Sequence, residues 1–268
     1  MRQVKDQLGN VHEFGKVPSR IISLVPSLTE LLVDLGLEKE LIGITKFCVH
    51  PKYLQDQKTI IGGTKNVHSK KVIDLQPEFI LSSKEENTRR TIDQLPDVPI
   101  YVSDIWDIQE LKKVVVDLGI IFGVEDRANK LIRDLDALVK ALQKKVVKKQ
   151  SCLYLIWKDP YMVAGSDTFI NEMLQLIGCE NAIKKWGDKG KRYPILEVED
   201  IIELNPDHIF LSSEPFPFAE KHMAELAAVT PSKIRLIDGE AFSWYGTGIL
   251  RQKDYLEALT QELHLARR

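Results

Sequence analysis

Short apolar stretches alternate with stretches of helical periodicity along the first 123 residues. The apolar stretches are rich in β-branched side chains, which is the pattern of buried strands. The helical stretches begin at capping signals and end at glycine or proline. Because strands and helices alternate, we expect an α/β lobe with a parallel sheet. The predicted strands cover residues 20–25, 41–45, 79–82 and 100–103, and the predicted helices cover 27–35, 70–75 and 107–122.

Local signals fix some ends of these elements. Capping boxes at Ser27–Glu30 and Asp107–Glu110 are expected to open two of the helices, and Gly123 is expected to end the second. A turn at Leu8–Asn10 predicts an N-terminal hairpin, with a return strand from Val11 to Phe14.

The stretch 126–149 differs in kind from the rest. Apolar residues recur at every third or fourth position from Ala128 to Val146, and no glycine or proline interrupts them. This periodicity predicts one amphipathic helix of more than 20 residues, about 35 Å long at 1.5 Å per residue. By itself it is also compatible with an ordinary long core helix.

An internal repeat gives this helix a further meaning. Residues 72–85 align with residues 201–214 without a gap, and each copy reads as a helix end, a proline, a strand, two serines and a glutamate. We therefore expect two similar α/β lobes with parallel sheets, at 1–123 and 150–268, joined by a single long rigid helix at 124–149. The second lobe has predicted strands at 152–157 and 234–237 and a predicted helix at 168–177 that ends at Gly178.

Charge and composition exclude several classes of protein. The chain has 37 Lys and Arg residues against 39 Asp and Glu residues, and this balance argues against a nucleic-acid partner. No apolar run reaches the roughly 20 residues that a membrane-spanning helix needs, so we do not expect an integral membrane protein. The three cysteines cannot all pair with one another and lack the spacing of a zinc site.

The N-terminal residues bear on localisation. The first 15 residues contain no continuous apolar segment of the signal-peptide type, so the sequence as given is expected to be cytoplasmic. A periplasmic or lipid-anchored protein is the alternative if a leader has been removed. We expect a monomer.

Candidate binding residues follow the predicted strands. Ligands of open parallel sheets bind beyond the carboxyl ends of the strands, where Glu85 and Glu214 of the two repeat copies are expected to lie. If the lobes face each other, these glutamates flank one ligand cleft; otherwise they are ordinary loop glutamates. Neighbouring polar and aromatic residues favour a large, flat, partly apolar ligand. They are Glu86, Asn87, Trp106, Trp157, Tyr161, Tyr193, Phe216, Trp244 and Tyr245.

Signatures of catalysis are missing from the sequence, so we expect no enzyme. It contains no nucleophile elbow, phosphate-binding loop or HExxH motif. His50 is the one histidine that follows a predicted strand directly, in the segment Phe47–Pro51. Its imidazole could ligate a transition metal or a metal-centred cofactor, or it could be an ordinary surface histidine.

Four motifs in order, followed by the long helix, resemble the substrate-binding proteins of ABC importers for cobalamin and iron–siderophore complexes. The resemblance runs over essentially the whole chain and implies two α/β lobes bridged by a rigid helix, with the ligand in the cleft. The motifs are Arg20–Glu30, Ile42–Thr45, Ile61–Gly63 and Leu75–Leu81.

Several residue roles are implied by this resemblance alone. His50 occupies the place of a ligand-contacting tyrosine in the cobalamin-binding member, and Thr64 that of a tryptophan over the corrin. Tyr193 matches another aromatic residue of that pocket. Glu199 matches one of two glutamates that dock onto the permease, whereas Lys70 replaces the other and reverses its charge.

The functional expectation is therefore a non-catalytic solute-binding component of an ABC-type uptake system, or a cytoplasmic derivative of one. Its ligand would be a metal chelate such as a corrinoid, haem or ferric siderophore, with no intrinsic cofactor. Charged residues of both signs follow the predicted strands, which favours a neutral or cationic complex. They are Lys46, Lys84, Lys158, Arg192, Glu85, Glu86 and Glu214. The alternative is a chelatase-like enzyme that acts on a tetrapyrrole or a metal, with His50 and a carboxylate handling protons.

Overall fold

The computed structural model describes residues 1–186 and 192–265 and contains two compact α/β units. The first unit contains residues 1–136 together with residues 245–248, and the second contains the other described residues. The α/β class predicted from the sequence is confirmed. The division between the units falls inside the long helix, and the segment 245–248 packs in the first unit.

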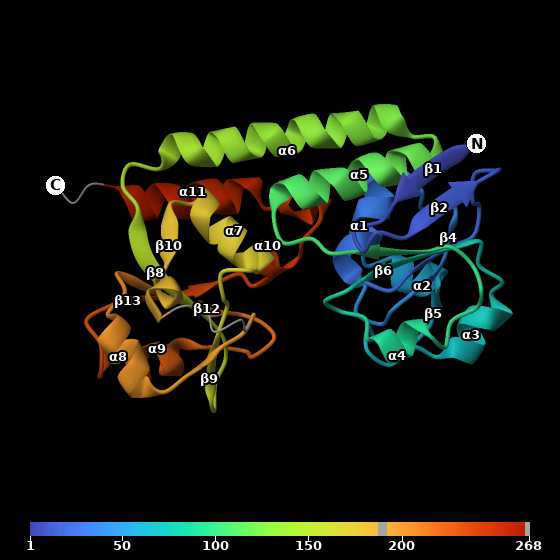
Figure 1. The fold of residues 1–268 in the computed structure, drawn as a ribbon. Coiled ribbons are helices and arrows are strands. Elements are labelled where there is room, and N and C mark those ends of the chain that lie inside the picture. The colour runs from blue at the N-terminus through green and yellow to red at the C-terminus, as the bar shows by residue number, and fades with distance from the viewer. Residues whose placement is uncertain (187–191, 266–268) are drawn as a thin grey trace. The chain divides into compact units, whose positions relative to one another are not determined.

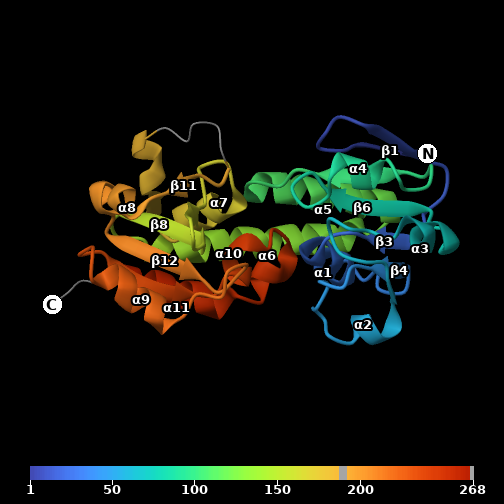
Figure 2. The same ribbon diagram turned by 90° about the horizontal axis from the view of Figure 1, so that it is seen from below.

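A parallel five-stranded sheet forms the centre of the first unit, with the strand order β5-β4-β3-β6-β7. Figure 2 shows β3, β4 and β6 side by side. The strand β3, in the middle of this order, is fully buried, and two of its three residues, Ile21 and Ile22, are apolar. The strands are β3 (Ile21–Ser23), β4 (Leu41–Ile44), β5 (Thr59–Ile60), β6 (Phe79–Ser83) and β7 (Ile100–Ser103).

The three predicted helices of the first unit lie near their predicted positions, with one correction at a helix start, and two further short helices of this unit were not predicted. The N-cap of α1 is Val25 and Pro26 opens the helix, so the predicted capping box at Ser27 is wrong. Proline fixes a helical φ at the first position of a helix and needs no N–H partner there. The helices are α1 (Pro26–Asp34), α2 (Leu54–Gln57), α3 (Ser69–Asp74), α4 (Arg89–Ile92) and α5 (Ile108–Phe122).

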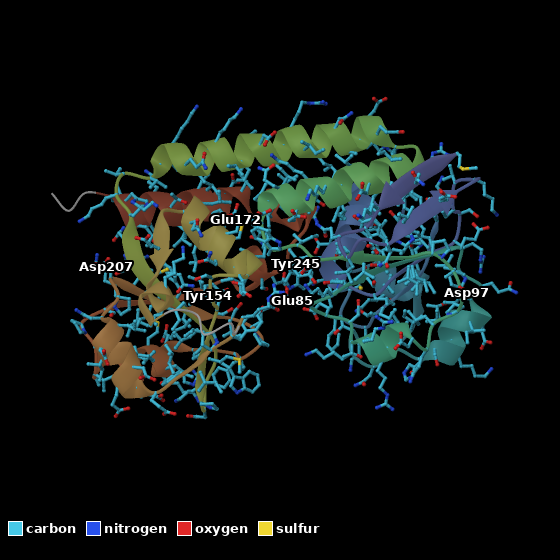
Figure 3. The ribbon with its side chains drawn as sticks, in the orientation of Figure 1. Glu85, Asp97, Tyr154, Glu172, Asp207 and Tyr245 are labelled. Atoms are coloured by element: carbon cyan, nitrogen blue, oxygen red, sulfur yellow. The ribbon has the colours of Figure 1, made fainter. Side chains whose placement is uncertain are left out.

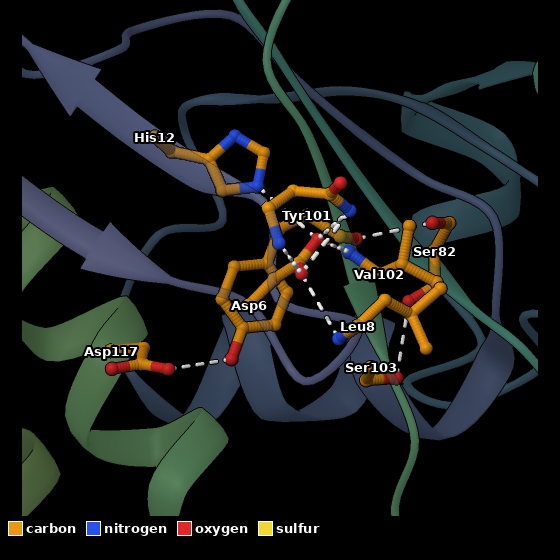
Figure 4. A network of polar contacts seen from close by, with 9 residues as sticks. Asp6, Leu8, His12, Ser82, Tyr101, Val102, Ser103 and Asp117 are labelled. Atoms are coloured by element: carbon orange, nitrogen blue, oxygen red, sulfur yellow. Dashed lines mark hydrogen bonds and ion pairs between the residues drawn. The ribbon is translucent and has the colours of Figure 1, made fainter.

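The predicted N-terminal hairpin is confirmed as β1 (Arg2–Lys5) and β2 (Val11–Phe14). The buried carboxylate of Asp6 accepts hydrogen bonds from the backbone N–H groups of Leu8 (3.0 Å), Asn10 (2.8 Å) and Val102 (3.2 Å). Because Val102 belongs to β7, Asp6 ties the hairpin to the edge of the sheet (Figure 4). Burial alone would raise the pKa of Asp6, but its hydrogen bonds outweigh burial and lower the pKa.

The long helix α6 (Glu125–Lys145) lies close to its predicted position. Acidic residues occupy its first turn and lysines its last, as the helix dipole favours. Its N-terminal half belongs to the first unit and its C-terminal half to the second. The buried stripe of the helix contains Ala128, Leu131, Leu135, Leu138 and Leu142.

The second unit has a mixed sheet with the order β11-β9-β8-β12-β13, in which β10 also pairs with β8. Strands β10, β8, β12 and β13 run parallel, whereas β9 and β11 are antiparallel to their neighbours. The predicted parallel pairing is found for β8, β10, β12 and β13, and β9 adds an antiparallel edge because Asp159, at φ 60°, and Pro160 turn the chain straight back after β8. The strands are β8 (Gln150–Trp157), β9 (Tyr161–Val163), β10 (Cys179–Asn181), β11 (Ile195–Leu196), β12 (His208–Ser212) and β13 (Lys233–Ile237).

The helices of the second unit show the expected end signals. The Thr168 side chain caps α7 by accepting a hydrogen bond from the N–H of Asn171, and Gly178 follows the helix with φ 78°. Among the described helices, none is both long and apolar enough to cross a membrane. The α-helices are α7 (Phe169–Leu176), α8 (Val198–Leu204), α9 (Glu220–Ala227), α10 (Glu240–Ser243) and α11 (Lys253–His264), and two 3₁₀ helices cover Ala182–Trp186 and Thr247–Leu250.

The segment 245–248 completes the packing of the first unit although it lies late in the chain. The Thr247 hydroxyl donates a hydrogen bond to the carboxylate of Asp34, at the end of α1. A Cβ atom on Gly246 would lie 2.7 Å from the backbone oxygen of Ser27, so only glycine allows this close approach to α1.

Candidate functional site

The two copies of the internal repeat share one backbone-to-serine contact at the carboxyl ends of β6 and β12. In the first copy, the N–H of Glu85 donates to Ser83 Oγ (3.2 Å), and in the second the N–H of Glu214 donates to Ser212 Oγ (3.4 Å). Serine hydroxyls often stabilise turns in this way. The repeated Ser-x-Glu sequence therefore holds a glutamate backbone in place at the carboxyl end of a central strand in each unit.

A tyrosine hydroxyl reaches each of the two repeat serines. Tyr245 donates to Ser83 Oγ (2.8 Å) within the first unit, and Tyr154 Oη lies 3.2 Å from Ser212 Oγ within the second. Figure 3 labels both tyrosines together with Glu85. Burial raises the pKa of Tyr154, which keeps its hydroxyl protonated. Tyr245 is only 5% exposed, so its position in a predicted loop gave no sign of its burial.

The carboxylate of Glu214 is hydrogen-bonded to the last residue of α10 and to the residue that follows this helix. Its Oε1 atom accepts hydrogen bonds from the Ser243 hydroxyl (2.9 Å) and from the indole N–H of Trp244 (2.9 Å). A Cβ atom on Gly239 would lie 2.6 Å from Glu214 Cγ, so a glycine is needed beside this glutamate. The structure thus brings together two of the residues that the sequence singles out, Glu214 and Trp244.

Asn87 holds the loop that carries Thr64. Its side-chain amide donates to the carbonyl oxygen of Thr64 (2.8 Å), and its side-chain oxygen accepts from the N–H of Ser83 (2.9 Å). A residue not singled out in the sequence, Thr91, adds a second tie by donating to the carbonyl oxygen of Lys65 (3.1 Å). No local sequence signal marks either contact, because the partners are more than 20 residues apart.

The aromatic candidates differ in their surroundings. The ring of Trp157, 42% exposed at the end of β8, lies 5.7 Å from that of Phe216, and Phe216 lies 4.7 Å from Phe218. Trp106 is 48% exposed in the loop after β7. Tyr193 is half-buried just before β11. Tyr161 is not a loop residue but the first residue of β9, where it packs against the core of the second unit.

The other candidates occupy loops and helix surfaces. His50 and Glu86 are half-buried, in the loops after β4 and β6. Glu199 is exposed in the first turn of α8, and the exposed Lys70 on α3 forms an ion pair with Asp74 (3.4 Å). Within the described ranges, no group of three or more His, Cys, Asp or Glu side chains is arranged to hold a metal ion. Ligation by His50 alone, with a chelate supplying the other donors, stays a prediction.

Two hollows lie at the carboxyl edge of the sheet in the first unit. The larger, of about 520 Å³, opens beside the ends of β4 and β5 and is lined by Lys46, Phe47, Gly62, Gly63, Thr64, Lys65, Asn66 and His68. The smaller, of about 460 Å³, is lined by Lys65, Asn66, Val67, His68, Thr88, Arg90, Thr91 and Gln94. Among the sequence-predicted ligand-contact residues that the structure describes, Thr64 lines the larger of these two hollows, together with Lys46 from the charged residues noted in the sequence.

Known proteins are similar to this chain in sequence and in fold. The chain is 32% identical over 203 residues to the ABC transporter substrate-binding lipoprotein YvrC of Bacillus subtilis, which covers 72% of this chain and 63% of that protein. It is 26% identical over 127 residues to the high-affinity haem uptake system protein IsdE of Staphylococcus aureus, which covers 46% of this chain and 42% of that protein. The matches therefore span 63% and 42% of the lengths of these relatives.

A solved structure extends the likeness to almost the whole chain. The periplasmic haem-binding protein HutB of Vibrio cholerae superposes with a TM-score of 0.73 at 25% identity, over 90% of this chain and 98% of that one. The family described as periplasmic binding protein matches residues 21–233, which include most of both units. By this match and by its likeness to YvrC, the chain belongs to the periplasmic binding protein family.

Proposed function

We propose that this protein binds a metal chelate and delivers it to an ABC-type importer. The observation that carries the proposal is the duplicated Ser-x-Glu turn, which presents a glutamate at the carboxyl end of a central strand in each unit. Haem is the ligand of the similar proteins IsdE, of a haem uptake system, and HutB, a haem-binding protein, which supports a chelate as the ligand class. In this proposal the protein binds the ligand and performs no chemistry on it.

The proposed setting is outside the cytoplasmic membrane. YvrC is a substrate-binding lipoprotein of an ABC transporter, which supports this setting. In the proposal the protein takes up its ligand on the outer side and passes it to a permease. We propose Glu199, exposed on α8, as a contact for that permease. Lys70 would present a positive charge to the permease instead of the negative charge of the cobalamin-binding member, so the first unit would need a different partner residue.

A titration of the purified protein followed by visible absorbance tests the ligand class. We expect a saturable change of the absorption bands with at least one member of a panel of haemin, hydroxocobalamin and a ferric hydroxamate. If His50 is the axial ligand, the His50→Ala variant should lose the band of the ligated metal, and added imidazole should restore it. A band that persists in this variant would remove the role of His50 only, whereas no binding of any panel member would refute the proposed function.

Glutamine substitutions test the two repeat glutamates. Gln can still accept the hydrogen bonds that Ser243 and Trp244 donate to Glu214, so Glu214→Gln removes the charge and keeps the local contacts. We expect Glu85→Gln and Glu214→Gln each to weaken ligand binding by about 1–3 kcal/mol, the range for a hydrogen bond to a charged group. Glu125→Gln, at an exposed position in the first turn of α6, is the matched control. Unchanged affinity in both variants would refute the role of these carboxylates.

A further inference from the structure

We propose that the ligand carries a free carboxylate group and that Lys46 and Lys65 bind this group at the two hollows of the first unit. This inference rests on the proposed function and narrows it to chelates with acidic side arms. Haem has two such arms, its propionates, whereas the corresponding side chains of cobalamin are neutral amides.

The hollows contain charge of one sign only. They share Lys65, Asn66 and His68, and they add Lys46 on one side and Arg90 on the other. Among the described residues that line them, none is an aspartate or a glutamate. Because fixed positive charge in a concave surface attracts anions, this edge of the sheet favours a negatively charged group.

The positive charges at the hollows are not neutralised by neighbours. Over residues 1–186 and 192–265, neither Lys46 nor Lys65 forms an ion pair, and the ammonium group of Lys46 lies 5.0 Å from the centre of the Phe47 ring. Other loop lysines are neutralised, since Lys84 pairs with Asp104 (2.6 Å) and Lys158 pairs with Glu225. The sequence does not show which lysines are paired with carboxylates. The expectation of a neutral or cationic complex therefore gave paired and unpaired lysines the same weight.

The loop that carries Lys65 is held in one conformation. Its two ends are joined by hydrogen bonds from the N–H of Gly63 to the Asn66 oxygen (3.1 Å) and from the N–H of His68 to the Ile61 oxygen (2.8 Å). Gly62 has φ 113°, and a Cβ atom there would lie 2.4 Å from the Asn66 oxygen. Together with the ties from Asn87 and Thr91, these contacts fix the backbone before ligand binds, which lowers the entropic cost of binding.

The tip of this loop, residues 64–66, also presents backbone N–H groups that make no hydrogen bond within the described part of the chain. In the described part of the chain, the backbone N–H groups of Thr64, Lys65 and Asn66 donate to no protein acceptor. Successive free N–H groups in a turn are a common feature of anion sites, and a carboxylate accepts several hydrogen bonds at once. The two lysines would supply the charge and the loop would supply the donors.

A comparison of haemin with its diamide, in which neutral amides replace both propionates, measures the contribution of the carboxylates to binding. Both compounds carry the same iron and macrocycle, and only haemin has free carboxylates. We expect the wild-type protein to bind haemin roughly tenfold or more tightly than the diamide. The Lys46→Gln/Lys65→Gln double variant should lose most of this preference by weakening haemin binding and leaving diamide binding unchanged. Lys84→Gln, which removes a lysine already paired with Asp104, is the matched control and should keep the full preference.

The outcomes separate this inference from the proposed function. Equal affinity of the wild-type protein for haemin and the diamide would overturn the inference and leave chelate binding in place. Binding of hydroxocobalamin or a ferric hydroxamate, without binding of haemin, would also overturn the inference alone. A preference that survives in the double variant would overturn the assignment to Lys46 and Lys65. Binding of no chelate would refute the proposed function itself.

Discussion

Replacement of Tyr245 with alanine is expected to lower the free energy of unfolding by about 3–5 kcal/mol, the range for truncating a large buried aromatic side chain. The side chain is 5% exposed and packs in the first unit, where its hydroxyl donates to Ser83. Truncation would remove buried apolar surface and leave a cavity between elements that are distant in sequence. Urea denaturation followed by circular dichroism measures the change.

Two further variants separate the ring of Tyr245 from its hydroxyl. Tyr245→Phe keeps the ring and removes one hydrogen bond, so it should cost about 1 kcal/mol. Tyr53→Ala is the matched control for loss of a tyrosine side chain, because Tyr53 is 42% exposed and should cost little. If Tyr245→Ala were no more destabilising than Tyr53→Ala, the burial of Tyr245 in the first unit would be contradicted.

The stability of the second unit is expected to fall as the pH decreases from about 6.5 to about 4, because of His208. Burial and the nearby charges of Lys233 and Arg235 lower the pKa of His208 from 6.5 to about 4. The side chain is 1% exposed, its Nε2 atom lies 2.8 Å from Gln150 Oε1, and its Nδ1 atom has no partner among the described residues. Protonation would therefore place an unpaired charged N–H in the interior.

The sign of this effect follows from proton binding. Between pH 4 and pH 6.5 the unfolded chain binds a proton at His208 that the folded protein does not, so stability rises with pH in this window. We expect a contribution of about 2–3 kcal/mol between pH 7 and pH 4.5. His208→Gln keeps a side chain that can bond to Gln150 and cannot titrate, so its stability should fall less over the same range. An equal fall in both proteins would assign the pH dependence to other groups.

The parts of the fold that were predictable from sequence rest on interactions between near neighbours. Asp107 caps α5 and Gly123 ends it in the left-handed conformation, and Thr168 and Gly178 act in the same way around α7. At the start of α1 two local signals compete, the capping box at Ser27 and the proline at position 26. The prediction from the capping box was wrong, because Pro26 opens the helix. The strands β5, β9, β10 and β11 were not predicted because two or three residues carry too little periodicity to be recognised.

The candidate site was predictable only in part, because many of its contacts join residues that are distant in sequence. The repeat marked Glu85 and Glu214 because identical residues recur in the same order, and in the structure the backbone N–H of each donates to the repeat serine two residues before it. The burial of Tyr245, the tie from Asn87 to Thr64 and the neutralisation of Lys84 by Asp104 all depend on tertiary partners. Sequence identifies such residues as polar or aromatic but does not identify what they contact.

The late position of segment 245–248 has a consequence for synthesis. The first unit takes nearly all its residues from the first 136 but needs Tyr245 and Thr247 to complete its contacts with Ser83 and Asp34. A ribosome makes these two residues only after it has made every strand of the second unit. The nascent first unit therefore lacks these two contacts until most of the chain has been translated.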